Sequence, residues 1–237
     1  MRAWATVARH VGATGTDVSF PAVCDACVAA LELTGSWLTL MTSPAERERA
    51  YASDPLAASL EESQFTLGEG PCEEAFASGL PVLASDLDSE ESLQRWPVFA
   101  PAAVQSTARA LFAFPLRKGA VQLGVFATYR DSAGALLPDQ IADAQVFADL
   151  VLNLVLDAQS HGSGHTAHWL NDDGSLGGAV VHQATGMVAV QLRVDLGEAL
   201  VRLRAHAFAN QLPLAEVAAG VVNRTLRFSR GVDADPL

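Results

Sequence analysis

Long hydrophobic runs are missing from this sequence of 237 residues, although half of its residues are hydrophobic. A membrane-spanning helix needs about 20 consecutive apolar residues, and the chain contains no such stretch. Its first ten residues, MRAWATVARH, also lack the apolar core of a secretory signal. We therefore expect a cytoplasmic protein with no membrane partner, and the hydrophobic content predicts one or two domains with a sizeable core.

Cysteine is scarce, with only Cys24, Cys27 and Cys72. An odd number in a chain without an export signal argues against a disulfide framework. Cys24 and Cys27 have the spacing of a redox or zinc motif, but they fall in the stretch Val23 to Leu31, which reads as helix. A tetrahedral zinc site needs two further ligands, and only Cys72 is offered at any distance. We expect buried small residues here, and neither a metal nor a cofactor.

Signatures of catalysis are absent as well. The chain has no Gly-Lys-Ser/Thr loop to hold a phosphate, and its Gly68 to Pro71 loop carries an acidic residue instead. No phosphoacceptor pattern of a receiver domain is visible. We therefore expect that the protein is not an enzyme.

Positive charge is rare and unevenly distributed. The chain carries 15 Lys and Arg residues against 27 Asp and Glu residues, a net charge of −12. The segment from 180 to 230 reverses this balance, with six arginines against three acidic residues. A basic region on an acidic protein favours a polyanionic partner, most simply nucleic acid.

Helical period and punctuation predict three helices in this basic segment. The first runs from Val180 to Leu192, and the third begins at Pro213 and ends near Arg227. Between them, Asp195 and Glu198 have the spacing of a capping box that begins the second helix. The side chains expected to face inward are those of Val181, Ala184, Met187, Val188, Leu192, Leu196, Ala199, Leu200, Leu203, Ala207, Leu214, Val217, Ala218, Val221 and Val222. The alanines let the helix axes approach closely, which predicts a compact three-helix bundle.

Three runs within these helices form a pattern: Gln183-Ala184-x-Gly186-Met187, Glu198-Ala199-x-x-x-Leu203-Arg204-x-x-Ala207 and Leu214-x-x-Val217-Ala218-x-x-Val221-Val222. The pattern resembles the ANTAR domain, an RNA-binding module of bacterial antitermination regulators. The resemblance implies a homodimer that binds paired hairpin loops in a nascent transcript, so that a terminator does not form and transcription continues.

Arg204 lies inside the motif of this resemblance and is the first candidate for RNA contact. The next candidates, which are basic and lie off the apolar face, are Arg202, Arg224 and Arg227. His206 and Phe208 offer rings for stacking on bases, although we expect Phe208 to be packed inside. The alternative for each arginine is plain solvation of a helix face.

Residues 1 to 160 alternate between helical and strand patterns. An antiparallel sheet with helices packed against it, an α+β fold, accommodates this order. Helices are expected at Asp17 to Leu33, Asp54 to Ser63, Pro71 to Ala77 and Pro138 to Gln159, and strands at Ser36 to Thr42, Ala50 to Ser53, Pro81 to Ala84, Ala110 to Leu116 and Ala120 to Tyr129. The last two strands form a hairpin joined across Arg117-Lys118-Gly119, and the segment from Ser85 to Ser106 is mixed, with a break at Trp96-Pro97.

Several motifs of this region are found together in one family. They are Leu67-Gly68-Glu69-Gly70-Pro71-Cys72, Gly79-x-Pro81-Val82, Asp86-Leu87, Trp96-Pro97-x-Phe99, and Phe114-Pro115-Leu116-x-x-Gly119 leading into Leu123-Gly124-Val125. They resemble the GAF domain, which implies a sensor for a small-molecule ligand or a dimerisation module. The combination with an ANTAR-like segment is similar to actinobacterial regulators of that composite type.

A ligand pocket, if the GAF-like domain has one, is expected between the sheet and the segment from Asp54 to Pro101. The candidate lining residues are Trp96, Phe99, Phe112, Phe114 and Cys72. The alternative is that all five are ordinary core residues.

We expect a GAF-like domain at 1–160, a Gly-rich linker at 161–178, an ANTAR-like bundle at 179–230 and a tail at 231–237. The favoured hypothesis is an RNA-binding antiterminator controlled by the GAF-like domain. A second hypothesis is a ligand-binding or dimerisation protein whose bundle contacts protein or DNA. A third is a thiol enzyme that uses one of the cysteines.

Overall fold

The computed structural model describes residues 19–41, 43, 47–160, 177–210 and 212–229. The chain divides into two compact units, residues 1–174 and 175–237, called here the N-terminal unit and the bundle unit. Most of the expected linker, residues 161–176, and the expected tail, residues 231–237, lie outside the described residues. The three expected boundaries between these four segments therefore stay a prediction.

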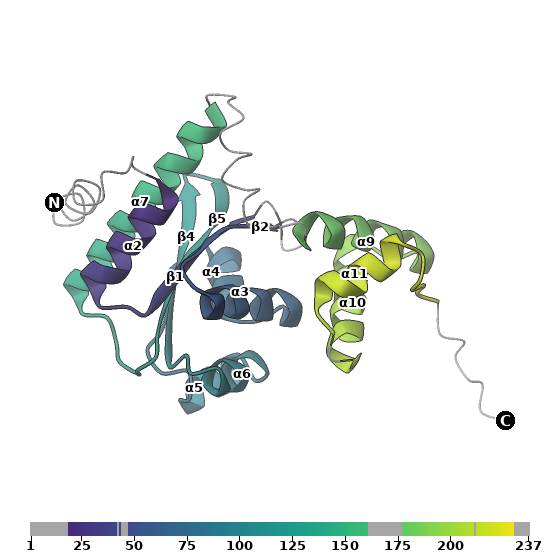
Figure 1. Cartoon of the computed structure of the whole chain (residues 1–237), viewed down its shortest axis with the longest axis horizontal. Helices are drawn as coiled ribbons and strands as arrows, with labels where there is room; N and C mark the ends of the chain where they lie inside the picture. The colour runs from purple at the N-terminus through teal and green to yellow at the C-terminus, as the bar shows by residue number, and fades with distance from the viewer. Residues whose placement is uncertain (1–18, 42, 44–46, 161–176, 211, 230–237) are drawn as a thin grey trace. The chain divides into compact units, whose positions relative to one another are not determined.

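The N-terminal unit is built on one five-stranded antiparallel sheet with the strand order β2-β1-β5-β4-β3 (Figure 1). The strands are β1 (Gly35–Met41), β2 (Arg47–Ala52), β3 (Val82–Ala84), β4 (Ala110–Lys118) and β5 (Val121–Arg130). This confirms the expected α+β fold. The hairpin turn was predicted at Arg117-Lys118-Gly119. It consists instead of Gly119 and Ala120, because Lys118 pairs with Val121. Arg117 and Lys118 thus belong to strand β4.

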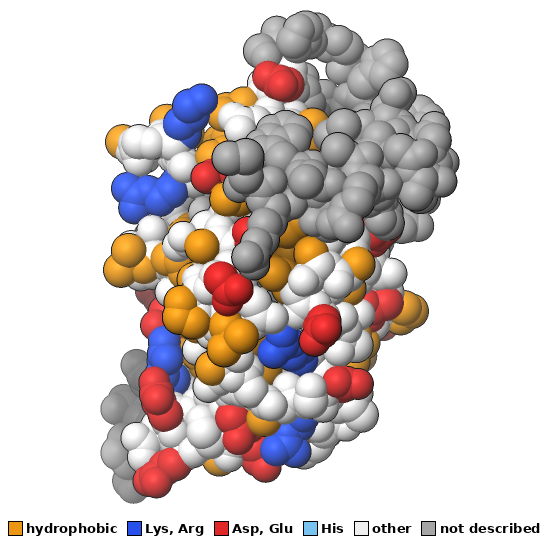
Figure 2. Space-filling view, turned by 90° about the vertical axis from the view of Figure 1, so that its left-hand side faces the viewer, with side chains coloured by type: hydrophobic (Ala, Val, Ile, Leu, Met, Phe, Trp, Pro, Cys, Tyr) orange, Lys and Arg blue, Asp and Glu red, His pale blue; other side chains and the backbone are white. Residues whose placement is uncertain are grey.

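Two helices, α2 (Phe20–Leu31) and α7 (Pro138–Ser160), cover one face of the sheet (Figure 1). The predicted start of α2 at Asp17 lies outside the described residues. The side chain of Ser19 accepts a hydrogen bond from the amide of Ala22, and this N-cap makes Phe20 the first helical residue. Glu32, with φ of 54°, takes the left-handed conformation that ends the helix before Leu33. Seen from this side, hydrophobic side chains lie among acidic and basic ones (Figure 2).

Four helices cover the opposite face: α3 (Pro55–Leu67), α4 (Pro71–Ser78), α5 (Glu90–Arg95) and α6 (Phe99–Gln105) (Figure 1). Helix α3 runs four residues beyond its predicted end and stops where Gly68 adopts a φ of 71°. The mixed segment resolves into α5 and α6, which are separated at Trp96-Pro97 as expected. Each face of the sheet thus has its own hydrophobic core.

The bundle unit consists of α9 (Gly177–Leu192), α10 (Leu196–Asn210) and α11 (Leu214–Val222) (Figure 1). Oδ1 of Asp195 accepts a hydrogen bond of 2.8 Å from the amide of Glu198, which is the predicted cap of α10. Two expectations were wrong. Leu196 sits in the first turn of α10 with 52 % of its surface exposed, and α11 ends at Val222 because Arg224 turns the chain with a φ of 63°.

Alanines form much of the interior of the bundle. Ala184, Ala199, Ala207 and Ala218 are all fully buried, together with the larger Val188. Residues without long side chains bring the helix backbones close, so that α9 contacts both α10 and α11. Apart from Thr185, whose hydroxyl donates to the carbonyl of Val181, the described interior is apolar, and the arginines of the unit lie at its surface and edges.

Candidate functional sites

The two arginines of α10 occupy different environments. Arg202 is exposed and forms an ion pair of 3.1 Å with Glu198, one helical turn before it. Arg204 is half-buried, and its Nε and Nη2 atoms are covered by the protein. Of these two candidates for RNA contact, Arg202 thus presents the more accessible guanidinium group.

The other candidates are two arginines that follow α11 and one histidine of α10. Arg224 and Arg227 are exposed in the segment that follows this helix. His206, on α10, is half-buried, and its ring meets that of Phe228 edge to face, with centroids 5.4 Å apart and planes at 64°. Phe208 is 60 % exposed, so the expectation that it is packed inside was wrong.

Sequence reasoning missed the partners that hold this region together. The amide of Phe228 donates a hydrogen bond of 2.9 Å to Oε1 of Gln191 on α9. The side-chain amide of Asn210 donates to the carbonyl oxygen of His206. The third helix was expected to continue to near Arg227, and so no signal in the sequence pointed to the reversal of the chain that brings Phe228 back to the bundle.

The five candidate pocket residues of the N-terminal unit do not come together. Phe112 and Phe114 belong to the core beneath α2 and α7. Trp96, Phe99 and Cys72 belong to the core on the other face of the sheet. Alternate residues of a strand point to opposite faces, so Phe112 and Phe114 point away from α3 to α6. One pocket lined by all five side chains, as predicted, is therefore wrong.

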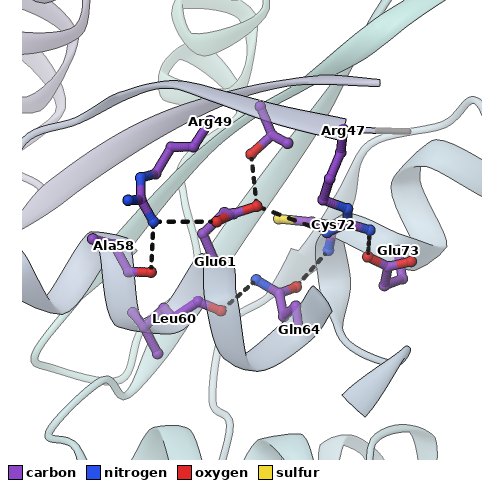
Figure 3. Close-up of polar contacts among 9 residues, drawn as sticks. Arg47, Arg49, Ala58, Leu60, Glu61, Gln64, Cys72 and Glu73 are labelled. Carbon is purple, nitrogen blue, oxygen red and sulfur yellow. Dashed lines mark hydrogen bonds and ion pairs between the residues drawn. The ribbon is translucent and has the colours of Figure 1, made fainter. Parts of the chain in front are cut away.

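A buried cluster of charged and polar side chains lies between the sheet edge and α3 and α4 (Figure 3). Arg47 of β2 is 7 % exposed and pairs with Glu73 of α4 and, at 3.8 Å, with Glu61 of α3. The contact of Arg47 is with Oε1 of Glu61, which also accepts a hydrogen bond of 3.4 Å from the hydroxyl of Thr39. Arg49 lies 3.5 Å from Oε2 of the same carboxylate. Two guanidinium groups thus face two carboxylates in a space largely closed to water.

Burial governs the ionisation of Glu61. Desolvation raises the pKa of Glu61 above its ordinary value, and the positive charge of Arg47 opposes the shift. The guanidinium of Arg47 also lies 4.3 Å from the centre of the Phe65 ring, a cation–π geometry. Sequence reasoning missed the cluster, because its members come from four separate elements, β1, β2, α3 and α4, with no common spacing.

Side-chain hydrogen bonds from Gln64 and Glu69 hold the loop between α3 and α4 in place. The amide of Cys72 donates a 2.8 Å hydrogen bond to Oε1 of Gln64, whose Nε2 donates to the carbonyl of Leu60 (Figure 3). Oε1 of Glu69 accepts hydrogen bonds from the amides of Val98 and Phe99 at the start of α6. The acidic residue of this loop therefore caps a helix.

The three cysteines are buried, and burial raises the pKa of each thiol well above its ordinary value. The thiolate is the reactive form of cysteine, and a thiol held protonated is a poor nucleophile and ligand. Among the described residues, no three His, Cys, Asp or Glu side chains gather as a metal site would require. The expected linker also contains three histidines, His161, His165 and His168, which lie outside the described residues.

Comparison with known families divides the chain where its charge balance changes. The sequence model of the GAF domain matches residues 16–155, and that of the ANTAR domain matches residues 177–222. The second match spans α9, α10 and α11. No curated protein sequence matches the chain.

Solved structures share the fold of the N-terminal unit. The GAF domain of a phosphoenolpyruvate-protein phosphotransferase from Coxiella burnetii is 12 % identical and has a TM-score of 0.50, over 68 % of this chain and 96 % of that one. The GAF domain of the Acinetobacter phosphoenolpyruvate-protein phosphotransferase is 11 % identical with the same TM-score, over 68 % and 98 %. At such identities the likeness concerns the fold alone. Across the described residues, no helix has both the length and the apolar character needed to span a bilayer.

Proposed function

The chain belongs to the GAF domain family and carries an ANTAR domain after its GAF domain, and from this premise we propose that it is an RNA-binding transcription antitermination regulator. The bundle of α9 to α11 binds hairpin loops in a nascent transcript, and the GAF domain controls that binding. The presence of the two domains indicates a signalling regulator with a sensory GAF domain.

The placement of positive charge is the observation that carries the proposal. The chain as a whole has a charge of −12, whereas the bundle segment has twice as many arginines as acidic residues. Arg202, Arg224 and Arg227 are exposed on this unit. Lys and Arg side chains that neutralise phosphates supply most of the affinity for nucleic acid. A basic surface of this kind on an acidic protein directs a polyanion to the bundle unit.

We propose that the protein acts in the cytoplasm as a homodimer, so that two bundles meet two hairpins of one transcript. The GAF domain then acts by changing the spacing or availability of the two bundles. We propose that a small-molecule ligand of this domain binds on the side of the sheet covered by α3 to α6, where Trp96, Phe99 and Cys72 lie. The actinobacterial origin implied by the resemblance stays a prediction.

Binding of the full chain to a fluorescently labelled RNA with two hairpins tests the proposal, with scrambled RNA and duplex DNA as competitors over a series of salt concentrations. We expect retention of the hairpin RNA that weakens with salt, and weaker binding by Arg204→Ala, whose residue lies in the ANTAR motif. Lys118→Gln, which removes one positive charge from the N-terminal unit, is the control and should bind like the wild type. Equal competition by duplex DNA from a folded sample would overturn the proposal in favour of a DNA partner.

A further inference from the structure

The chain continues past the residues matched by the ANTAR domain, and the continuation folds back onto the bundle. The match ends at residue 222, where α11 also ends. Arg224 then takes the left-handed conformation, and the amides of Thr225 and Leu226 both donate to the carbonyl of Gly220. These bonds are those of a helix C-cap that reverses the chain. The following segment, Asn223 to Ser229, is called here the C-terminal arm.

The C-terminal arm is fastened to two other helices. The amide of Phe228 is bonded to Gln191 of α9, and its ring packs against His206 of α10. Phe228 is half-buried as a result. With the bonds to Gly220 of α11, the arm contacts every helix of the bundle. These contacts hold the backbone of the arm against the bundle, and so the positions from which its side chains extend are fixed.

The arm carries positive charge that no carboxylate of the described residues neutralises. Its residues include Arg224 and Arg227 but no acidic residue. Both arginines are exposed, and neither pairs with a carboxylate among the residues that the structure describes. By contrast, Arg202 is paired with Glu198, and two nitrogen atoms of Arg204 are covered. Of the four exposed arginines among the described residues of the bundle unit, Arg193, Arg202, Arg224 and Arg227, the last two lie on the arm, outside the matched domain.

We propose that the C-terminal arm is a phosphate-binding element of the RNA site, in which Arg224 and Arg227 contact the backbone of the hairpin RNA. Phe228 and Gln191 are positioning residues that hold the arm against the bundle. The inference rests on the proposed function, because it takes RNA as the partner. Guanidinium groups bind phosphate through paired, charge-assisted hydrogen bonds. An arm that is already docked loses less conformational entropy on binding than a free tail would lose.

The test measures the salt dependence of RNA binding in the full chain. Each phosphate contact contributes about 0.7 to 0.9 to the slope of log K against log salt concentration. The double variant Arg224→Gln/Arg227→Gln should therefore lower the slope by about 1.4 to 1.8, which corresponds to about 15- to 30-fold weaker binding at 0.15 M salt. Lys118→Gln is the matched control and should leave the slope unchanged.

Phe228→Ala separates positioning from charge, because it removes no cation. We expect it to weaken binding and to lower the salt slope towards that of the double variant, while the helical circular dichroism signal stays at the wild-type level. An unchanged slope in both variants, with selective hairpin binding by the wild type, would overturn the role of the arm alone. A wild-type chain that shows no selective hairpin binding would overturn the proposed function, and the role of the arm with it.

Discussion

The carboxylate of Glu69 lies 2.7 Å from the backbone nitrogen of Phe99, thirty residues further along the chain. The same oxygen accepts a hydrogen bond from the amide of Val98. The first amides of a helix have no partner within the helix, and a carboxylate there also meets the positive end of the helix dipole. Two motifs that stand apart in the sequence, Leu67 to Cys72 and Trp96 to Phe99, thereby form one structural unit.

Replacing Glu69 should therefore destabilise the GAF domain. Glu69→Ala leaves the amides of Val98 and Phe99 without their acceptor, and we expect a loss of about 1 to 3 kcal/mol in the free energy of unfolding. Urea unfolding followed by tryptophan fluorescence measures it. Glu91→Ala, which removes an exposed carboxylate paired with Arg95, is the control and should cost less than about 1 kcal/mol. A loss for Glu69→Ala no larger than that of the control would contradict the capping role.

Gly124 allows β1 and β5 to approach each other. Its φ is 154°, and a Cβ atom at this position would overlap the carbonyl oxygen of Thr39 on the neighbouring strand. Gly124→Ala should reduce the free energy of unfolding by about 3 kcal/mol or more, because both the backbone conformation and the strand pairing are disturbed. In the hairpin turn, Gly119 has a φ of 61° with open space around it, so Gly119→Ala should cost only about 1 kcal/mol. Chemical denaturation of the two variants side by side gives the comparison, and equal losses would refute the steric argument.

The buried carboxylate of Glu61 should give the stability of the protein a distinctive pH dependence. Burial raises its pKa in the folded state, so the folded protein binds a proton more readily than the unfolded chain does. The contribution of Glu61 to stability is therefore fully present below its unfolded pKa and is lost as the pH rises through the folded pKa. Glu61→Gln lacks this titration.

The measurement is the free energy of unfolding of the wild type and of Glu61→Gln at several values between pH 7 and pH 4.5. We expect the wild type to gain stability relative to the variant as the pH falls. Parallel pH profiles would mean that Arg47 and Arg49 keep Glu61 ionised throughout this range. Glu90→Gln, which removes an exposed carboxylate of α5 away from the cluster, serves as the control for the loss of one acidic group.

The order of helices and strands was predictable, because period and punctuation are local properties. The alternating pattern of β1 and the prolines at the starts of α3 and α4 belong to short stretches of sequence. The helices that a strand residue faces, by contrast, depend on how distant parts of the chain pack against the sheet. Phe112 and Phe114 were expected to face α3 to α6, and only the placement of α2 and α7 shows which face of β4 they occupy.

The candidate sites were predictable in their residue types and less so in their partners. Arg224 and Arg227 were found because they are basic and lie off an apolar face. Phe228, which fastens the segment that carries them, has contacts 22 and 37 residues away in His206 and Gln191. The ion pair between Arg47 and Glu73 likewise joins a strand to a helix across 26 residues. Such pairs become visible only when the chain is folded.

The ion pair between Glu198 and Arg202 offers a prediction of increased affinity. The carboxylate of Glu198 lies 3.1 Å from the guanidinium of Arg202, on the exposed surface of α10. If the bundle binds RNA as proposed, Glu198→Gln frees Arg202 for phosphate and removes a negative charge beside it. We expect about 2- to 5-fold tighter binding to the hairpin RNA at 0.15 M salt, and a steeper salt dependence, since about one more phosphate contact becomes available.

Glu216→Gln is a close control for this change, because Glu216 is also an exposed acidic residue in the first turn of a helix of the same bundle. Both variants raise the net charge by one, and both lose a similar interaction with a helix dipole. A general effect of charge would therefore strengthen RNA binding equally in the two. A larger gain for Glu198→Gln assigns Arg202 to the RNA surface, whereas equal gains would show that only the total charge of the bundle matters and would remove Arg202 from the site.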